Sequence, residues 1–298
     1  MLLSITWEVD PAIFTIFGRE VRWYGLFFAL GLVVASSIVY RIFKHEKHPE
    51  KWFDSLFIYM LVGIVVGARL GHVIFYEPLR FLASPGDIFR IWEGGLASHG
   101  GVIGIIIAVW LYSRKVTKES IMWTLDRVMV PTGFAAAMIR FGNLMNHEIY
   151  GGPTNAPWGF RFVENTHQWM RGAEPIFTDP SHPTQIYEAL VYLLVFGVTM
   201  YMYWKTTAVQ REGLITGVGI VMIFVARFFI EFIKNTQVEA EYAILESIGL
   251  NIGQLLSIPF VVWGVWLIVR SSKVQGSKVQ GSKVQGSKVQ GSKKNITK

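Results

Sequence analysis

Two arginines stand near the ends of long apolar stretches of this chain. Arg140 ends the stretch 120–141, and Arg227 falls late in the stretch 213–233. A guanidinium keeps its charge and presents a planar fork of N–H donors that fits a phosphate group. The pair therefore predicts a site for an anionic ligand. A phospholipid headgroup is the nearest such anion in a membrane, and composition alone does not separate it from a transported anion.

Other ionisable and amide side chains fall within or beside apolar stretches, where burying a charge is costly. The candidates are Arg69, His72, His99, His182, Thr184, Gln185, Tyr187, Glu188 and Glu231. In the membrane orientation that the loop charges predict, described below, all of these residues lie in the outer halves of their predicted helices. We therefore expect one polar cavity that opens toward the outer leaflet.

Structural explanations compete with functional ones for four residues. Arg227 and Glu231 are four residues apart on one helix face and can neutralise each other. Tyr24 is typical of the aromatic belt at a membrane interface. A lone His99 is typical of a packing residue, but the glycine-rich run 94–101 around it predicts exposed backbone at membrane depth. Such backbone is tolerated only where it lines a cavity or is buried in protein.

The elements that must position these residues are transmembrane helices. The chain has 298 residues, of which 52% are hydrophobic and only 16% are charged, and its mean hydropathy is +0.38. A membrane span needs roughly 20 mostly apolar residues. Seven stretches qualify: 22–43, 53–76, 95–113, 120–141, 184–204, 213–233 and 251–270. The predicted fold class is an all-α polytopic membrane protein with seven transmembrane helices.

Lysine and arginine in the loops predict the orientation of these helices, because positive charge is retained on the cytoplasmic side. The flanks at 41–51, 114–118 and 205–211 and the segment after residue 270 carry more Lys and Arg than the opposite flanks. We therefore expect the N-terminus outside and the C-terminus inside.

The composition divides the chain into three parts. We expect residues 1–21 to form an extracytoplasmic arm and residues 22–270 a membrane domain with a small outer cap at about 142–183. The cytoplasmic tail, 271–298, holds seven lysines and no acidic residue, and repeats Ser-Lys-Val-Gln-Gly four times over 272–291. A polar low-complexity tract of this kind is predicted to be disordered.

Several kinds of chemistry are excluded by composition and motif. The chain has no cysteine, so it supplies no disulfide and no thiol nucleophile. Its net charge of +7 belongs to the tail, which argues against a nucleic-acid partner. The run 94–101 has no lysine and follows no predicted strand, so it is not a nucleotide phosphate loop. No metal and no cofactor are predicted.

The segment RFGNLMNHEIYG, residues 140–151, resembles the signature of the prolipoprotein diacylglyceryl transferase family. The resemblance covers about residues 22–270 in order, and includes RWYG at 22–25, the glycine-rich run 94–101, HPTQIYE at 182–188 and RFFIEF at 227–232. Two positions depart from the family pattern, Ile139 and Leu144, and both are apolar packing positions.

The resemblance implies an enzyme of a bacterial cytoplasmic (inner) membrane with its active site toward the outer leaflet. The family transfers the diacylglyceryl group of phosphatidylglycerol to the lipobox cysteine thiol of a preprolipoprotein signal peptide, which is the first step of lipoprotein maturation. The reaction forms a thioether and releases glycerol phosphate. Its implied partners are phosphatidylglycerol, the signal peptide and membrane lipids. The absence of cysteine fits, because the thiol belongs to the substrate.

The same motif match assigns site residues. The implied catalytic residues are Arg140, Arg227, His99 and Tyr24, and the implied substrate-binding residues are Asn143, Asn146, Glu148, Gly151, Gln185, Tyr187, Glu188 and Glu231. Arg69 is a further candidate for substrate binding, because its charge falls inside an apolar stretch. A thiol with a pKa of about 8.5 is mostly protonated at neutral pH and needs a base. A histidine, with an ordinary pKa of about 6.5, is a better base than a tyrosine of about 10. The arginines are suited to stabilising the departing phosphate.

Two other classes of protein share some of these features. A secondary transporter for a small anion or lipid is expected to show internal repeats and interrupted helices near the bilayer midplane. The halves of this chain show no such self-similarity. A seven-helix ligand receptor shares the number of spans and little else. Neither class explains the set of motifs.

Overall fold

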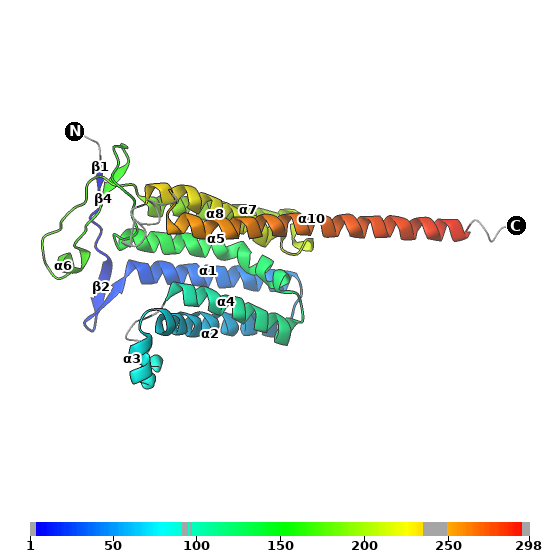
Figure 1. Cartoon of the computed structure of the whole chain (residues 1–298), viewed down its shortest axis with the longest axis horizontal. Helices are drawn as coiled ribbons and strands as arrows, with labels where there is room; N and C mark the ends of the chain where they lie inside the picture. Colours follow the sequence, from blue (N-terminus) through cyan, green and yellow to red (C-terminus); the bar gives the residue numbers. More distant parts are fainter. Residues whose placement is uncertain (1–3, 91–94, 96, 235–248, 294–298) are drawn as a thin grey trace. The chain divides into compact units, whose positions relative to one another are not determined.

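The computed structural model describes residues 4–90, 95, 97–234 and 249–293, and for residues 98–99 and 273–293 it describes the backbone only. Gly94 and Leu96, which belong to the predicted glycine-rich turn, lie outside the described residues. Within the described part the chain is mostly helical (Figure 1).

Seven of the described helices are long and apolar enough to cross a membrane, which confirms the predicted number of spans. Most of their bounds lie within a few residues of the predicted ones. They are α1 Trp23–His45, α2 Glu50–Phe75, α4 Ser98–Tyr112 continued by η3 Ser113–Thr117, α5 Ile121–Met145, α7 Thr184–Lys205, α8 Leu214–Ile230 continued by η5 Glu231–Ile233, and the first part of α10 Ile252–Lys293.

Short elements lie between and before the long helices, and the sequence did not predict the strands among them. They are β1 Ser4–Thr6, β2 Ala12–Ile16, β3 Arg19–Arg22, α3 Pro78–Ala83, η1 Pro85–Phe89, β4 Gly159–Arg161, α6 Thr166–Trp169 and η4 Ala208–Gln210. Strand β1 pairs in parallel with β4, and β2 pairs antiparallel with β3. β1 and β4 have three residues each and β2 and β3 only five and four, at or below the short end of the four to eight residues over which alternation identifies a strand.

The chain divides into two compact units, residues 1–35 with 129–298 and residues 36–128. In the second unit α2 and α4 pack closely through glycines. A Cβ on Gly63 of α2 would lie 2.7 Å from the carbonyl oxygen of Gly104 on α4. Small residues of this kind let two membrane helices bring their backbones together.

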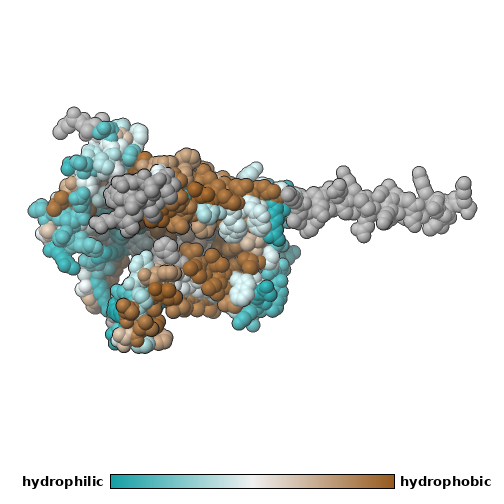
Figure 2. Space-filling view, in the orientation of Figure 1, coloured by the Kyte–Doolittle hydropathy of each residue, from teal (hydrophilic) through white to brown (hydrophobic). Residues whose placement is uncertain are grey.

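The first unit contains the helices that carry the signature residues. Its membrane core is a buried cluster contributed by α5 and α7, with partly buried aromatic rings packed around it: Ala137, Met138, Ala189 and Tyr192, with Phe27, Phe134 and Phe141. The loops that carry β1, β4 and α6 lie at one end of these helices, and Figure 2 shows hydrophilic residues there and hydrophobic residues over the helices. This end is the region predicted as a cap.

The cap has a small core of its own. Leu144, Phe160 and Phe162 are buried together, and Trp7 packs on them and donates an indole hydrogen bond to the Leu144 carbonyl oxygen at 3.1 Å. The N-terminal arm therefore forms part of the cap.

His147 joins three segments of the cap. Its Nε2 lies 2.9 Å from the carbonyl oxygen of Val9, and its Nδ1 accepts a hydrogen bond from the Val163 N–H at 3.1 Å. A carbonyl accepts only and a backbone N–H donates only, so the ring is neutral with its proton on Nε2. Burial lowers the pKa of His147 below its ordinary 6.5, outweighing the Val9 carbonyl and the nearby Asp10 carboxylate, which raise it.

We expect acid to loosen the cap through His147. Because the pKa is lower in the folded state, the stabilisation is complete above about pH 6.5 and is lost as the pH falls from there toward the folded pKa. Protonation at Nδ1 removes the acceptor of the Val163 N–H. Hydrogen exchange at the Val163 amide, corrected for intrinsic rate, is expected to accelerate between pH 7.5 and pH 5.5, values chosen as about one unit on either side of 6.5.

A matched pair of variants checks this prediction. His147→Asn removes the titrating ring at a position with φ of 56°, which asparagine tolerates, and is expected to abolish the pH dependence of the Val163 exchange rate. His167→Asn removes an exposed histidine of the same cap and is expected to leave the dependence unchanged. An equal pH dependence in wild type and His147→Asn would contradict the assignment.

Helix α10 continues through Lys293, beyond the predicted span and through the lysine repeats. This differs from the disorder that the composition predicts from residue 271. The repeat contains no proline and one glycine in five residues. Extending an existing helix adds one hydrogen bond for each residue fixed and needs no new nucleus, so a helix that begins in the membrane can continue into such a sequence.

Candidate active site

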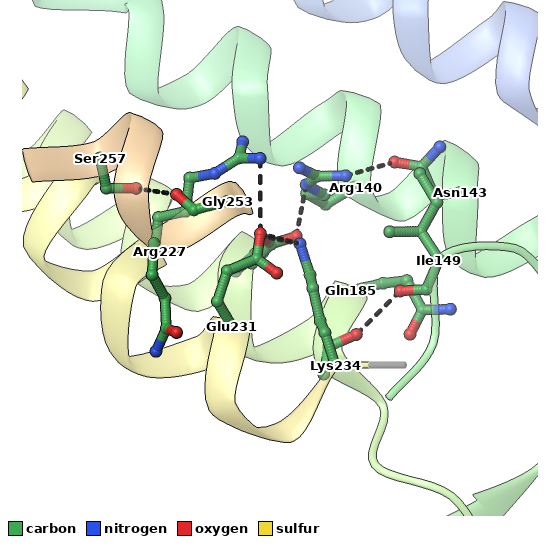
Figure 3. A network of polar contacts seen from close by, with 12 residues as sticks. Arg140, Asn143, Ile149, Gln185, Arg227, Glu231, Lys234, Gly253 and Ser257 are labelled. Carbon is green, nitrogen blue, oxygen red and sulfur yellow. Dashed lines mark hydrogen bonds and ion pairs between the residues drawn. The ribbon is translucent and has the colours of Figure 1, made fainter. Parts of the chain in front are cut away.

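Five charged side chains form one continuous network in the first unit, referred to below as the charged network (Figure 3). Arg140 Nε lies 2.6 Å from Glu188 Oε2, and Lys234 Nζ lies 2.9 Å from Glu188 Oε1. The same Lys234 Nζ lies 3.6 Å from Glu231 Oε1, which lies 3.4 Å from Arg227 Nη2. The charges alternate in sign along the network, from α5 through α7 to α8 and η5.

Burial differs along the charged network. The side chains of Glu188 and Lys234 are only 1% and 8% exposed, whereas that of Arg227 is 36% exposed. A buried charge is stable only when it is paired and hydrogen-bonded. The buried charges of Glu188 and Lys234 therefore depend on each other for stability. Arg227 is the most exposed cation of the network and is the most accessible to an incoming anion.

Arg140 also contacts an asparagine side chain, which in turn is hydrogen-bonded to Glu148. Its Nη1 donates to Asn143 Oδ1 at 3.2 Å, and Asn143 Nδ2 donates to Glu148 Oε1 at 2.9 Å. Asn146 Nδ2 donates to the same Glu148 oxygen at 3.2 Å. Tyr192 is a further hydrogen-bond partner of the Arg140 guanidinium. The guanidinium is thus fixed in position before any ligand arrives.

The turn that follows α5 brings Glu148 back toward the asparagines. Ile149 has a φ of 60°, an uncommon conformation for a β-branched residue. Two side chains from the start of α7 hold this turn, because Thr184 Oγ1 donates to the Ile149 carbonyl at 2.8 Å and Gln185 Nε2 donates to the Glu148 carbonyl at 2.7 Å. Strained backbone that the surroundings hold in place is typical of functional sites.

Gly151 positions the backbone beside Lys234. Its N–H donates to the His182 carbonyl at 2.8 Å, and the next N–H, of Gly152, donates to the Ile233 carbonyl at 2.8 Å. A Cβ on Gly151 would lie 2.8 Å from Thr184 Cγ2 and close to the Ile233 carbonyl. Only glycine fits this close approach to the backbone next to Lys234.

Comparison with known proteins identifies the family. The family model described as prolipoprotein diacylglyceryl transferase matches residues 11–270. The chain belongs to the prolipoprotein diacylglyceryl transferase family. A protein of Porphyromonas gingivalis named phosphatidylglycerol–prolipoprotein diacylglyceryl transferase is 57% identical over 271 residues, 90% of this chain and 95% of the relative. Proteins of the same name from Chloroherpeton thalassium and Tolumonas auensis are 44% and 40% identical, each over 90% of this chain and 95% and 97% of the relative.

Most of the residues that the family motifs single out lie around the charged network. Arg140, Arg227, Glu188 and Glu231 are members of it, and Asn143, Asn146, Glu148, Gln185 and Gly151 are joined to it by the contacts above. Arg227 and Glu231 do form the ion pair that their spacing predicts, and Glu231 also contacts Lys234.

Tyr24 contacts α5, whereas Tyr187 contacts Trp158 and His182. A Cβ on Gly142 would lie 2.7 Å from Tyr24 Cδ2. The Tyr24 ring therefore packs on α5 at Gly142, which lies between Arg140 and Asn143 in the sequence. The Tyr187 hydroxyl instead accepts a hydrogen bond from Trp158 Nε1 at 2.9 Å and lies 3.3 Å from His182 Nδ1.

Arg69 and His99 belong to the second unit. Arg69 is buried, and its guanidinium donates to the backbone carbonyls of Ile88 and Gly95 at 2.8 and 3.1 Å. These contacts join α2 to the backbone at Ile88 and Gly95. The His99 side chain lies outside the described part of the structure.

Sequence reasoning missed Lys234, the residue at the centre of the charged network. The signal was its spacing, since Arg227, Glu231 and Lys234 at intervals of four and three residues share one helix face. Among the described residues no group of three or more His, Asp or Glu side chains is placed to hold a metal ion.

Proposed function

We propose that this chain transfers the diacylglyceryl group of phosphatidylglycerol to the thiol of a lipobox cysteine in a preprolipoprotein signal peptide. The observation that supports this most strongly is the charged network, which places Arg140 and Arg227 at its two ends. Three cations and two carboxylates leave the charged network with one net positive charge, and its two guanidinium groups are donors suited to a phosphodiester.

In the proposed reaction the cysteine sulfur attacks the glycerol carbon that carries the phosphate. A carbon–sulfur bond forms, the carbon–oxygen bond breaks, and its electron pair leaves with the phosphate as glycerol phosphate. His99 takes the thiol proton and Tyr24 lines the site. Arg140 and Arg227 stabilise the charge that grows on the departing phosphate more strongly in the transition state than in the bound lipid.

The remaining motif residues order the substrates in this proposal. Asn143, Asn146 and Glu148 hold Arg140 and the lipid headgroup, and Gly151, Gln185 and Tyr187 shape the turn and the cap above them. Arg69 positions the segment that leads to His99. The site opens toward the outer leaflet of the bacterial inner membrane, with the N-terminus and the cap outside and the tail inside.

Mass spectrometry of a lipobox peptide tests the proposal. The purified chain in phospholipid nanodiscs is incubated with the peptide and phosphatidylglycerol. We expect a peptide whose mass has increased by one diacylglyceryl group, with equimolar glycerol phosphate, and no product when serine replaces the peptide cysteine. Folded protein that binds both substrates and yields no adduct would refute the proposal and restore the transporter and receptor interpretations.

A further inference from the structure

The hairpin formed by β2 and β3 has one apolar and one polar face. In its register Phe14 pairs with Val21, Thr15 with Glu20 and Ile16 with Arg19. Successive side chains of a strand point to opposite faces. Phe14, Ile16 and Val21 therefore share one face with Arg19, and Thr15, Glu20 and Arg22 share the other.

On the polar face two charged side chains pair with each other, whereas the large side chains of the apolar face are exposed. Arg22 Nη2 lies 2.7 Å from Glu20 Oε2 on the polar face. Phe14 and Ile16 are 50% and 49% exposed, and Phe17 at the tip is fully exposed. Phe17 and Gly18 have φ values of 49° and 74°, as in the two-residue turns that join the strands of a tight hairpin. The turn thus projects Phe17 away from the rest of the unit.

The position of the hairpin relative to the membrane follows from its connection to α1. Strand β3 ends at Arg22, and the membrane-spanning helix α1 begins at Trp23. A strand rises about 3.3 Å per residue, so the tip is within roughly 20 Å of the start of the span. Figure 1 shows β2 at the end of α1 where the helix begins, so the hairpin lies close to the place where α1 meets the membrane surface.

We propose that the apolar face of this hairpin is embedded among phospholipids, at the boundary between headgroups and acyl chains of the leaflet that α1 enters at Trp23. A two-stranded hairpin alone is marginally stable in water, so an ordered one needs a surface over its apolar face. Lipid is present wherever α1 meets the bilayer. Arg19, exposed on the same face, is placed to reach lipid phosphates while its stem stays in the apolar layer.

The absence of cysteine permits a direct test in the full-length chain. Single nitroxide labels are introduced by Phe14→Cys, Ile16→Cys and Phe17→Cys on the apolar side and by Thr15→Cys and Glu20→Cys as matched controls on the polar side. In nanodiscs containing phosphatidylglycerol, the collision rates of each label with dissolved oxygen and with a water-soluble nickel chelate are measured.

We expect the logarithm of the oxygen-to-nickel ratio to be positive at positions 14, 16 and 17 and negative at 15 and 20. This alternation with a period of two identifies a strand lying in the interface and is not produced by a misfolded, mobile arm. Equal water accessibility on both faces would overturn the proposal. So would water accessibility at 14, 16 and 17 that disappears only when a lipobox peptide is added, which would assign the face to the peptide, or label–label broadening that grows with protein density, which would assign it to a second copy.

Discussion

Replacing Arg140 with lysine is expected to lower kcat for diacylglyceryl transfer by about 100-fold to 1000-fold, the usual effect of removing one preorganised charge-stabilising donor. Arg140 contacts Glu188 through Nε and Asn143 through Nη1 at the same time. A lysine has one ammonium group and no planar fork, so it keeps the charge and loses the geometry. The KM for phosphatidylglycerol is expected to change less than kcat, because the contact strengthens as charge develops on the phosphate.

Arg171→Lys is the matched control, because Arg171 is an exposed arginine of the cap. Its kinetic parameters are expected to equal those of the wild type in the same peptide assay. Full activity of Arg140→Lys, measured on protein with an unchanged thermal midpoint, would show that the fork of Arg140 plays no part in the reaction.

Lys234→Met is expected to destabilise the protein as well as inactivate it. Lys234 and Glu188 are both buried, and methionine leaves Glu188 paired to Arg140 alone and Glu231 paired to Arg227 alone. Removing one partner from a buried ion pair typically costs about 3–5 kcal/mol. We expect a clearly lower thermal midpoint, together with loss of transfer activity because both arginines are drawn toward the uncompensated carboxylates.

A second substitution separates charge imbalance from loss of packing. Lys234→Met removes one positive charge from the charged network, and adding Glu231→Gln removes one of the two carboxylates that contacted it. The double variant is expected to recover part of the thermal midpoint, so the two effects are not additive. Lys205→Met, an exposed lysine at the end of α7, serves as the control and is expected to be neutral. Strictly additive effects of Glu231→Gln and Lys234→Met would mean that the two side chains are not coupled.

The membrane helices were predictable from sequence because hydrophobic length is a direct physical requirement of the bilayer. The seven apolar stretches became α1, α2, α4, α5, α7, α8 and the first part of α10. The short strands were not predictable. β1 and β4 are three residues each and are more than 150 positions apart, so their pairing depends on the cap that Trp7, Leu144 and Phe160 build together.

The sequence predicted most residues of the candidate site but not the contacts between them. Intramembrane charge identified Arg140, Arg227, Glu188 and Glu231, because unpaired charge is costly in lipid. Which carboxylate pairs with which cation depends on how α5, α7 and α8 pack, and no sequence spacing relates Arg140 to Glu188. Lys234 was missed for the same reason, since its link to Glu188 spans 46 positions.

The most direct test of the account is the position of the phosphate when phosphatidylglycerol is bound. Electron cryomicroscopy of the chain in nanodiscs with phosphatidylglycerol and no peptide would locate it. We predict headgroup density with the phosphate within hydrogen-bond distance, about 3 Å, of the guanidinium groups of both Arg140 and Arg227. Headgroup density elsewhere, with the Arg140–Glu188 and Arg227–Glu231 contacts unchanged and no ligand between them, would contradict it.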